Sequence, residues 1–364
     1  VTKICCFLLL VVLAYFTLQL HQGGLFHYFT VYPSRLSGFD RCEKVFTTAV
    51  GSEDAQMLSK EPPVIFLSAS DHKTLMTEKT SPGAIHLFDV TTKKTTEVPI
   101  HGFSGIFHPH GISVFHTSNG KILLFVVNHQ NLGEDDQVLI FEYQNGKLIH
   151  QQTVEDEKII HINDVFATGE NSFFVTNNNG YPRGTIMSHI STLFPIFSKA
   201  SVVFWDGEKS SFTVPPGEID FPNGVVYSPE KKILYVANTM NPGALHIYSF
   251  DSDSKNSILL KKILLFSGID NLDIAEDGTL WAACHPNFIR FLVHASSGAT
   301  APSQVFRINV NNLDEILVDE IFLDDGNLIS GSSTALLVND FMVITPVFAD
   351  HIAVCQQNWQ FFTK

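Results

Sequence analysis

The chain has 364 residues, of which 45% are hydrophobic and 16% are charged, so it can bury a large core and is not a disordered protein. This length allows one large all-β domain or two ordinary domains. The formal net charge of −14 repels the phosphate backbone of nucleic acids, and no cluster of Lys and Arg offsets it, so a nucleic-acid-binding function is excluded.

The N-terminal segment differs from the rest of the chain. Residues 4–16 are all apolar and Lys3 precedes them, which is typical of an export signal. No convincing cleavage site of small residues follows, so we expect a retained signal peptide or signal-anchor over residues 1–20, followed by a helical connecting segment over residues 21–39. The protein is therefore expected to be secreted or anchored to a membrane, with its main domain on the extracytoplasmic side.

Short strands recur after residue 40. Each is a run of β-forming residues followed by a turn with Gly, Asn or Asp, and a spacing of about 40 to 60 residues is typical of propeller blades. The clearest copies are residues 84–90, 137–143, 201–207, 244–250 and 304–310. Four-stranded units that close into a ring over residues 40–355 explain this repeat better than a β-sandwich does. Apolar residues at helical spacing predict one helix within residues 181–198, lying over a face of the ring, and residues 356–364 are expected to form a C-terminal tail.

Oxygen donors stand at the ends of several hydrophobic strand segments. The side chains concerned are Glu53, Asp54, Asn163, Asp164, Asn223, Asp270 and Asn271. Carboxylate and amide oxygens are the ligands of hard cations, and calcium takes about six to eight of them. Because strand beginnings from different blades converge on the centre of a propeller, these residues would form one cage there. The alternative is that the Asn-Gly and Asp-Asn pairs are only turns, and spacing alone leaves both interpretations open.

Two histidines are candidates for acid-base chemistry. His110 lies on a predicted turn into a strand, and His129 ends the apolar run 122–128. A histidine that is hydrogen-bonded to a second histidine can act as a general base for water at neutral pH, although a lone histidine is more often structural. The sequence contains neither the HExxH pattern of zinc enzymes nor the GxSxG element of serine hydrolases.

The five cysteines fall into three groups. Cys5 and Cys6 lie in the apolar N-terminal segment, and Cys284 lies in a hydrophobic, strand-like run. Cys42 and Cys355 bracket almost all of the remaining chain. In an exported protein, a disulfide between these two would join the N-terminal strand to the C-terminal one and close the ring. The alternative is two buried free thiols.

Seven short segments carry a family resemblance. They are GSED (51–54), FHPHGIS (107–113), VVNH (126–129), INDV (162–165), FPNG (221–224), DN (270–271) and CHPN (284–287). In this order and at nearly these intervals they resemble the paraoxonase (arylesterase) family, and the similarity covers residues 40–355. The resemblance implies an all-β fold, a six-bladed β-propeller with a central calcium channel and a few covering helices.

The resemblance also implies two calcium ions and a histidine pair. The catalytic calcium would be bound by Glu53, Asn163, Asn223, Asp270 and Asn271. A second, structural calcium would be bound by Asp54, Asp164 and the backbone carbonyl of Ile112. The catalytic histidines would be His110 and His129, and the disulfide would join Cys42 to Cys355.

The substrate pocket of the family is matched less closely. His285 corresponds to a histidine that lines the family's active site. The other positions predicted for the pocket are Phe221, Phe291, Leu292, Ser333, Val347 and Phe348. Residues 67–75 are more polar than the corresponding family loop, and the sequence has no Asn-x-Ser/Thr glycosylation site. The metal ligands are therefore retained, whereas the pocket departs from the family pattern.

The resemblance implies hydrolysis of lactones and aryl esters, with organophosphate hydrolysis as a side activity. Calcium would polarise the substrate carbonyl as a Lewis acid, and His110, oriented by His129, would take a proton from the attacking water. The expected partners are a small lactone or ester substrate and a membrane or lipid particle, which the N-terminal apolar segment would contact. The alternative function is that of a membrane-anchored chaperone or assembly factor, because some invertebrate relatives of the family assist channel proteins.

Overall fold

The computed structural model describes residues 29–72, 82–130, 134, 136–193, 197–240 and 242–358, together with residues 17, 18 and 21. The predicted signal-anchor, residues 1–20, lies outside the described residues except at two positions, as do Cys5, Cys6 and most of the C-terminal tail. No helix among the described residues is both long enough and apolar enough to cross a membrane.

The described strands form six sheets of four antiparallel strands, and two of these sheets carry a fifth strand. The first sheet contains β3 (Ser52–Lys60), β4 (Pro63–Ala69), β5 (Ala84–Asp89) and β6 (Lys94–Glu97). The second contains β8 (Pro109–His116), β9 (Ile122–Asn128), β10 (Gln137–Gln144) and β11 (Lys147–Val154), with β7 (Ile100–His101) added. The third contains β12 (His161–Gly169), β13 (Ser172–Asn179), β14 (Ser201–Trp205) and β15 (Ser210–Val214). The other three are β16 (Pro222–Ser228), β17 (Ile233–Asn238), β18 (Ala244–Phe250) and β19 (Ser257–Leu264); β20 (Gly268–Ile274), β21 (Thr279–His285), β22 (Ser303–Asn309) and β23 (Leu317–Asp324), with β1 (Arg35–Leu36) added; and β24 (Ser332–Val338), β25 (Phe341–Pro346), β26 (His351–Gln357) and β2 (Phe39–Phe46).

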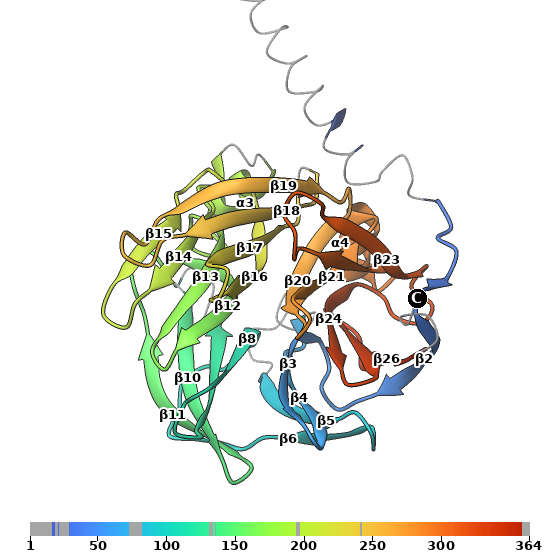
Figure 1. Cartoon of the computed structure of the whole chain (residues 1–364), viewed down its shortest axis with the longest axis horizontal. Helices are drawn as coiled ribbons and strands as arrows, with labels where there is room; N and C mark the ends of the chain where they lie inside the picture. Colours follow the sequence, from blue (N-terminus) through green and yellow to red (C-terminus); the bar gives the residue numbers. More distant parts are fainter. Residues whose placement is uncertain are drawn as a thin grey trace, which may run out of the picture.

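The six sheets stand as blades around a central axis, with β3, β8, β12, β16, β20 and β24 innermost (Figure 1). Six separate clusters of buried hydrophobic side chains fill the interfaces between neighbouring blades. Because both faces of a blade are buried, a strand such as β9 is apolar almost throughout rather than in alternation. The predicted six-bladed β-propeller is therefore confirmed, and the repeated strands found in the sequence are β5, β10, β14, β18 and β22, the third strands of five successive blades.

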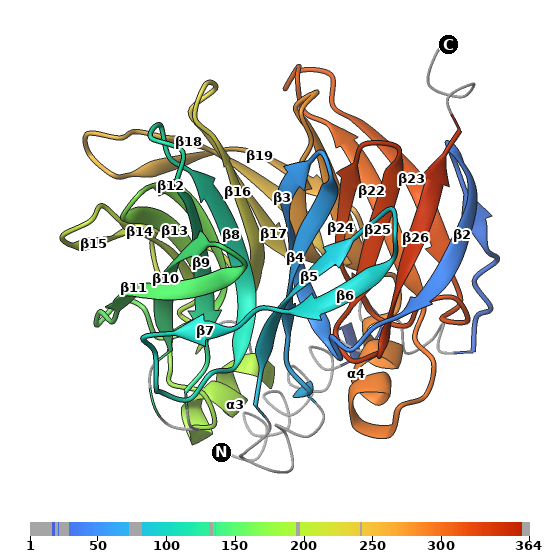
Figure 2. The same cartoon turned by 90° about the horizontal axis from the view of Figure 1, so that it is seen from below.

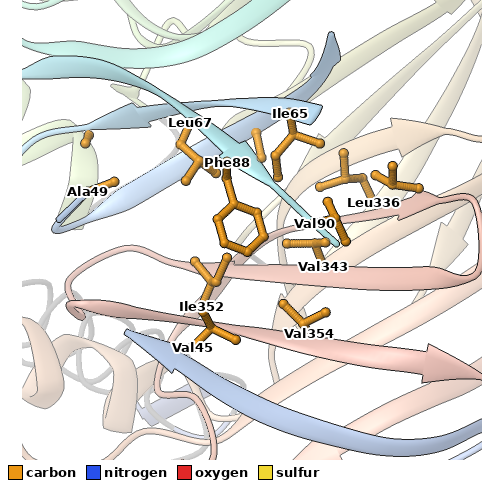
Figure 3. Close-up of a cluster of buried hydrophobic side chains, with 13 residues drawn as sticks. Val45, Ala49, Ile65, Leu67, Phe88, Val90, Leu336, Val343, Ile352 and Val354 are labelled. Carbon is orange, nitrogen blue, oxygen red and sulfur yellow. The ribbon is translucent and has the colours of Figure 1, made fainter. Parts of the chain in front are cut away.

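The last blade contains both ends of the propeller. β2, from the N-terminal side, pairs with β26, from the C-terminal side, and Cys42 lies opposite Cys355 in this pairing. These two cysteines form a disulfide, as predicted, whereas Cys284 is a buried free thiol. On the face of this blade that meets the first blade, Phe88 packs in one cluster with Ile352 (Figure 3). A covalent bond and hydrophobic packing therefore both close the ring.

Every innermost strand begins with the same irregularity. After the first or second paired residue, two residues of the innermost strand lie opposite one residue of the adjacent strand, which is the pattern of a β-bulge. In β12, for example, Asn163 and Asp164 lie between the paired residues Ile162 and Val165. A bulge re-aims side chains out of the regular ladder. The six bulges therefore bring side chains from six distant parts of the chain to one level of the axis.

Asparagines at the ends of second strands hold the chain that leads into these bulges. The side-chain oxygen of Asn128 accepts the N–H of His108 (2.7 Å), two residues before His110. Asn177 and Asn238 bind the equivalent segments of their own blades in the same way. These bonds give the approach to the innermost strand a fixed backbone path, because its polar groups cannot join the sheet ladder.

Two helices of the described chain lie on one face of the propeller (Figure 2). α3 (Ile186–Leu193) confirms the helix predicted within residues 181–198. α4 (Phe288–Ser297) lies outside the predicted elements. It begins at Asn287 of the CHPN segment, whose side chain accepts the N–H of Arg290 (3.0 Å) as a helix N-cap.

In the connecting segment, for which a helix is predicted over residues 21–39, His21 is helical but residues 29–39 are not, so the prediction is wrong for residues 29–39. Residues 29–38 contain no helix, and Arg35–Leu36 forms β1 by pairing with Phe322 and Leu323 of β23. The outer edge of β23 offers backbone hydrogen bonds to an extended chain, and this pairing replaces the bonds that a helix would make.

Candidate active site

One side chain from each innermost strand contributes to a ring around the axis. The first bulge positions form this first ring, which consists of Glu53, His110, Asn163, Asn223, Asp270 and Ser333. Four of the five predicted ligands of the catalytic calcium and the predicted base therefore lie at one level. Ser333, predicted as a pocket residue, is a member of this ring.

Neighbours in the first ring contact one another in blade order. Asn223 Nδ2 donates to Asp270 Oδ1 (2.6 Å). Ser333 Oγ lies 3.0 Å from Asp270 Oδ2 and 2.9 Å from Glu53 Oε1. The same Oε1 of Glu53 also lies 3.7 Å from His110 Nε2 on the next blade. The carboxylates are thus held in place by polar side chains of the adjacent blades.

The fifth predicted ligand, Asn271, joins the group from the second bulge position of β20. Its Nδ2 donates to Glu53 Oε1 (2.8 Å). Each of the five predicted ligands is at most 8% exposed. Burial raises the pKa of Glu53 well above its usual value, and the charge of the neighbouring Asp270 raises it further.

Several buried oxygens in this group have no hydrogen-bond partner among the protein atoms. They are Glu53 Oε2, Asn163 Oδ1, Asn223 Oδ1 and Asn271 Oδ1. Buried polar atoms are normally satisfied, so three such amide oxygens together with the carboxylates of Glu53 and Asp270 fit a hard cation such as calcium. No three His, Cys, Asp or Glu side chains of the described chain form a metal-binding group of their own, and the predicted set differs because three of its five members are amides.

The second bulge positions form a second ring, one residue further along each innermost strand. Its members are Asp54, Gly111, Asp164, Gly224, Asn271 and Thr334. The Asp54 carboxylate accepts the N–H of the following residue and, on the next blade, that of Ile112 (both 2.7 Å). Asp164 accepts the N–H of its own following residue (2.7 Å) and that of Val225 on the next blade (2.8 Å). Each aspartate therefore links two blades.

Only glycine fits between these aspartates. A Cβ at Gly111 would lie 2.5 Å from Asp164 Oδ1 and 2.6 Å from Asp164 Cα. Gly111–Ile112 therefore runs between Asp54 and Asp164, which brings together the residues predicted for the structural calcium. The bond that joins Ile112 to Asp54 uses its N–H. Burial raises the pKa of Asp164, and Asp54 raises it further, so these two carboxylates repel each other and a cation between them would fit.

The predicted histidine pair is in contact. The ring centroids of His110 and His129 are 4.7 Å apart, and His72 packs edge-on against His110 at 5.3 Å. His110 Nε2 lies 3.2 Å from Asn163 Nδ2, while its Nδ1 has no hydrogen-bond partner among the described residues. Burial lowers the pKa of His110 and of His129 well below the usual value, so both rings are neutral at pH 7 and can accept a proton.

Two residues outside the predicted site contact His129. Asp136, directly before β10, has its Oδ1 atom 3.1 Å from His129 Nδ1. Arg183, in the turn before α3, has its Nη2 atom 3.3 Å from His129 Nδ1 and 3.2 Å from Asp136 Oδ2. The segments around them carry no motif that points to the histidines, so only the fold reveals this contact.

Aromatic rings form a wall beside the carboxylates. His285 Nε2 lies 2.9 Å from Asp270 Oδ2, and its ring stacks on Phe291 of α4 with centroids 3.8 Å apart. Phe348 follows at 5.8 Å from Phe291 and also lies 6.3 Å from His72. The wall therefore joins three predicted pocket residues to the first ring and to the histidines.

The remaining predicted pocket residues are not part of this aromatic wall. Leu292 is 48% exposed on α4, and Val347 is buried and donates its N–H to the carbonyl of Gly331. Phe221 donates its backbone N–H to the Asn238 side chain. Their positions give no contact with the ring residues comparable to that of His285.

Comparisons with known proteins agree with this geometry. The family model described as arylesterase matches residues 38–356. The chain is 28% identical to serum paraoxonase/arylesterase 2 of Rattus norvegicus over 272 residues, which cover 73% of this chain and 75% of the relative. It is 27% identical to serum paraoxonase/arylesterase 1 of Homo sapiens over 315 residues, which cover 84% and 86%.

Solved structures share the fold at low sequence identity. A gluconolactonase from Xanthomonas campestris superimposes with a TM-score of 0.55 at 12% identity, covering 90% of this chain and 98% of that one. The PQQ-bound aldose sugar dehydrogenase of Streptomyces coelicolor gives a TM-score of 0.52 at 12% identity, covering 89% and 100%. Because these two have different chemistries, the likeness describes the propeller and not the reaction.

Proposed function

The chain belongs to the arylesterase family and is a carboxylic ester hydrolase, and we propose that it hydrolyses lactones and aryl esters with the help of bound calcium. The observation that carries the proposal is the group of four unpartnered buried oxygens, one from the Glu53 carboxylate and three from the amides of Asn163, Asn223 and Asn271. A second calcium, between Asp54 and Asp164, would have a structural role. When bound, a calcium ion supplies Lewis acidity that stabilises negative charge on a carbonyl oxygen.

The residues proposed to hold the catalytic calcium are Glu53, Asn163, Asn223, Asp270 and Asn271. They come from four blades, and their carboxylates and amides are already oriented by contacts within the two rings. This pre-organisation means that binding does not require large side-chain movements. His285 and Ser333 support the site indirectly, because both contact Asp270 Oδ2.

His110 is proposed to take the proton from the attacking water. Its side chain is only 14% exposed and its lowered pKa keeps the imidazole neutral at pH 7, its Nδ1 has no protein partner among the described residues, and it lies in the same ring as the carboxylates. His129, in contact with it, would orient the base and share the proton. The His285–Phe291–Phe348 wall favours a flat or apolar group on the substrate, as aryl esters and lactones with an alkyl chain provide.

We also propose that the propeller functions outside the cytoplasm. The Cys42–Cys355 disulfide supports this, because structural disulfides persist in oxidising compartments and are rare in the cytosol. Recovery of the protein in oxidised form from the secretory route of a host cell would agree with the proposal, and fully reduced cytosolic protein with the same activity would contradict it.

The direct test is an assay of phenyl acetate and of an aliphatic lactone with purified protein. Exhaustive chelation should abolish hydrolysis of both, and calcium should restore it, whereas magnesium should not, because it demands a smaller octahedral shell. Full activity in chelator would overturn the calcium proposal. Absence of hydrolysis in the calcium-loaded protein would overturn the substrate proposal.

A further inference from the structure

Asp136 occupies a position that the hydrolytic site described above does not explain. It lies directly before β10 and is 1% exposed. Its Oδ2 accepts the N–H of Ile162 (3.0 Å) and a bond from Arg183 Nη2 (3.2 Å). Its Oδ1 lies 3.1 Å from His129 Nδ1. One oxygen is thus held by backbone and guanidinium, and the other is directed at the histidine.

This contact selects one tautomer of His129. An ionised carboxylate only accepts hydrogen bonds, so the Nδ1 atom facing it must carry the proton. Nε2 is then the unprotonated ring nitrogen, and it can accept a hydrogen bond from Arg183 Nη2, 3.4 Å away. In a histidine, the hydrogen bond at one nitrogen decides the protonation of the other.

We propose that Asp136 is a positioning residue that holds His129 in the Nδ1-protonated tautomer and fixes its ring against His110, an inference that rests on the proposed hydrolytic function. Asp136 then contacts His129, and His129 in turn contacts His110. This is the logic by which an acid orients the base of a catalytic triad, extended here by one histidine. Asp136 itself touches no substrate in this arrangement.

Arg183 disfavours protonation of His129, which would otherwise form a charged pair with Asp136. Its Nη2 lies 3.3 Å from His129 Nδ1 and 3.4 Å from His129 Nε2, so the guanidinium stands beside the imidazole and also neutralises the carboxylate. Burial lowers the pKa of His129 most, and the charge of Arg183, with smaller contributions from His72 and His108, lowers it further. A second positive charge on His129 would be unfavourable there, and the neutral tautomer is retained.

The test uses the calcium-loaded full chain and the substitution Asp136→Asn. The amide can still accept the Ile162 N–H, but it no longer forces the proton onto His129 Nδ1. We expect kcat for lactone hydrolysis to fall by about 100-fold, with KM within about threefold, because positioning acts on the chemical step. Asp136→Glu, which keeps the charge, should recover part of the loss. Bound calcium should equal that of the wild type.

A matched control and a double substitution separate positioning from folding. Asp324 is also buried and accepts the backbone N–H groups of Gly326 and Leu328 (both 2.9 Å), so Asp324→Asn perturbs a similar acid in another blade and should leave kcat unchanged. In a His129→Gln background, Asp136→Asn should change kcat by less than about threefold, because residues that act as a unit are not additive.

The outcomes are distinguishable. Equal losses of kcat from Asp136→Asn in the wild-type and His129→Gln backgrounds would overturn the inference, as would a wild-type kcat in Asp136→Asn. If the wild-type protein itself hydrolyses neither lactone nor ester, the proposed function fails. If wild type is active, His110→Gln is inactive and Asp136→Asn is normal, the proposed function stands and this inference is wrong.

Discussion

The two rings at the centre of the propeller are one residue apart on every innermost strand, yet their polar atoms are satisfied differently. In the first ring, Glu53, Asn163 and Asn223 each keep one buried oxygen without a hydrogen-bond partner. In the second ring Asn271 also keeps such an oxygen, but both oxygens of Asp54 and of Asp164 accept backbone N–H groups. The same backbone device, a β-bulge, therefore presents two chemically different sets of side chains.

This difference indicates a division between function and stability. An unsatisfied buried oxygen destabilises a fold, and a site that keeps several of them is built for a ligand that supplies the missing interactions. The aspartates of the second ring use their oxygens to link neighbouring blades, so their removal should affect folding first. Substitutions in the two rings should separate these effects.

The largest effect on activity is expected from Asp270→Ala. Asp270 contacts Asn223, Ser333 and His285, so its loss removes a carboxylate and leaves three oriented side chains without their partner. Hydrolysis should fall to the background rate, and the protein should bind one calcium fewer, as measured by metal analysis after gel filtration. Asp324→Asn is the control, since it alters a buried acid of another site. Full turnover by Asp270→Ala in chelator would refute the role of this residue in metal binding.

Loss of the proposed base should have the next largest effect. His110→Gln keeps hydrogen-bonding capacity without basicity, so kcat should drop by about 10²- to 10⁴-fold while calcium stays bound. His129→Gln should lower kcat less, because His129 acts through its partner. A variant of His110 within threefold of wild-type turnover would remove this residue from the chemistry.

The pH profile tests the same assignment in the wild-type protein. The neutral imidazole is the active form, so turnover falls as the pH drops through the pKa of His110. Burial lowers that pKa well below 6.5. The acidic limb of kcat/KM should therefore lie below pH 6.5 and should disappear in the residual activity of His110→Gln. A limb that persists unchanged in this variant would belong to another group.

The sequence predicts the first ring well because each of its members is marked by the residues next to it in the sequence. Glu53, Asn223 and Asp270 each follow a turn and begin a hydrophobic strand, and the blade repeat brings these strand beginnings together. The position of the bulge within the repeated strand would also have identified Ser333-Thr334 as the sixth bulge. These residues follow Ser332, the first paired residue of β24, as Glu53-Asp54 follow Ser52 in β3. The repeat itself therefore carried more information than the individual motifs.

Other contacts cannot be predicted in this way. Asp136 and Arg183 lie in segments before β10 and α3, and neither segment follows the blade repeat. Their meeting at His129 depends on how two connections fold over one end of the axis, for which the sequence offers no periodic signal. The same holds for β1, whose extended form depends on the distant edge of β23.

A smaller effect, on stability, should separate the second ring from the first. Burial raises the pKa of Asp54 to about 7, above its unfolded value. The folded protein therefore binds more protons than the unfolded chain between about pH 4 and pH 7, and without calcium its stability should decrease as the pH rises through this window. Bound calcium should remove this decrease, because it favours the ionised carboxylates.

Thermal unfolding at pH 5 and pH 7, with chelator and with calcium, measures this dependence. Asp54→Ala and Asp164→Ala should both melt below the wild type in calcium, whereas their remaining activity at low temperature should exceed that of Asp270→Ala. Unchanged melting of Asp164→Ala under all four conditions would count against a structural site in the second ring.

The smallest effect, again on stability, is expected from a side chain added at a glycine of the second ring. A Cβ at Gly224 would lie 2.6 Å from the backbone nitrogen of Leu272, an atom of another innermost strand that cannot move without displacing Asn271. Gly224→Ala should therefore destabilise the fold by about 1–3 kcal/mol, seen as a lower melting temperature in calcium. Gly169→Ala is the matched control, because the nearest atom to its Cβ, at 2.7 Å, is the Ser172 hydroxyl, which can rotate away. Equal melting of the two variants would mean that the innermost strands can separate, and the close approach of the rings would then not depend on glycine.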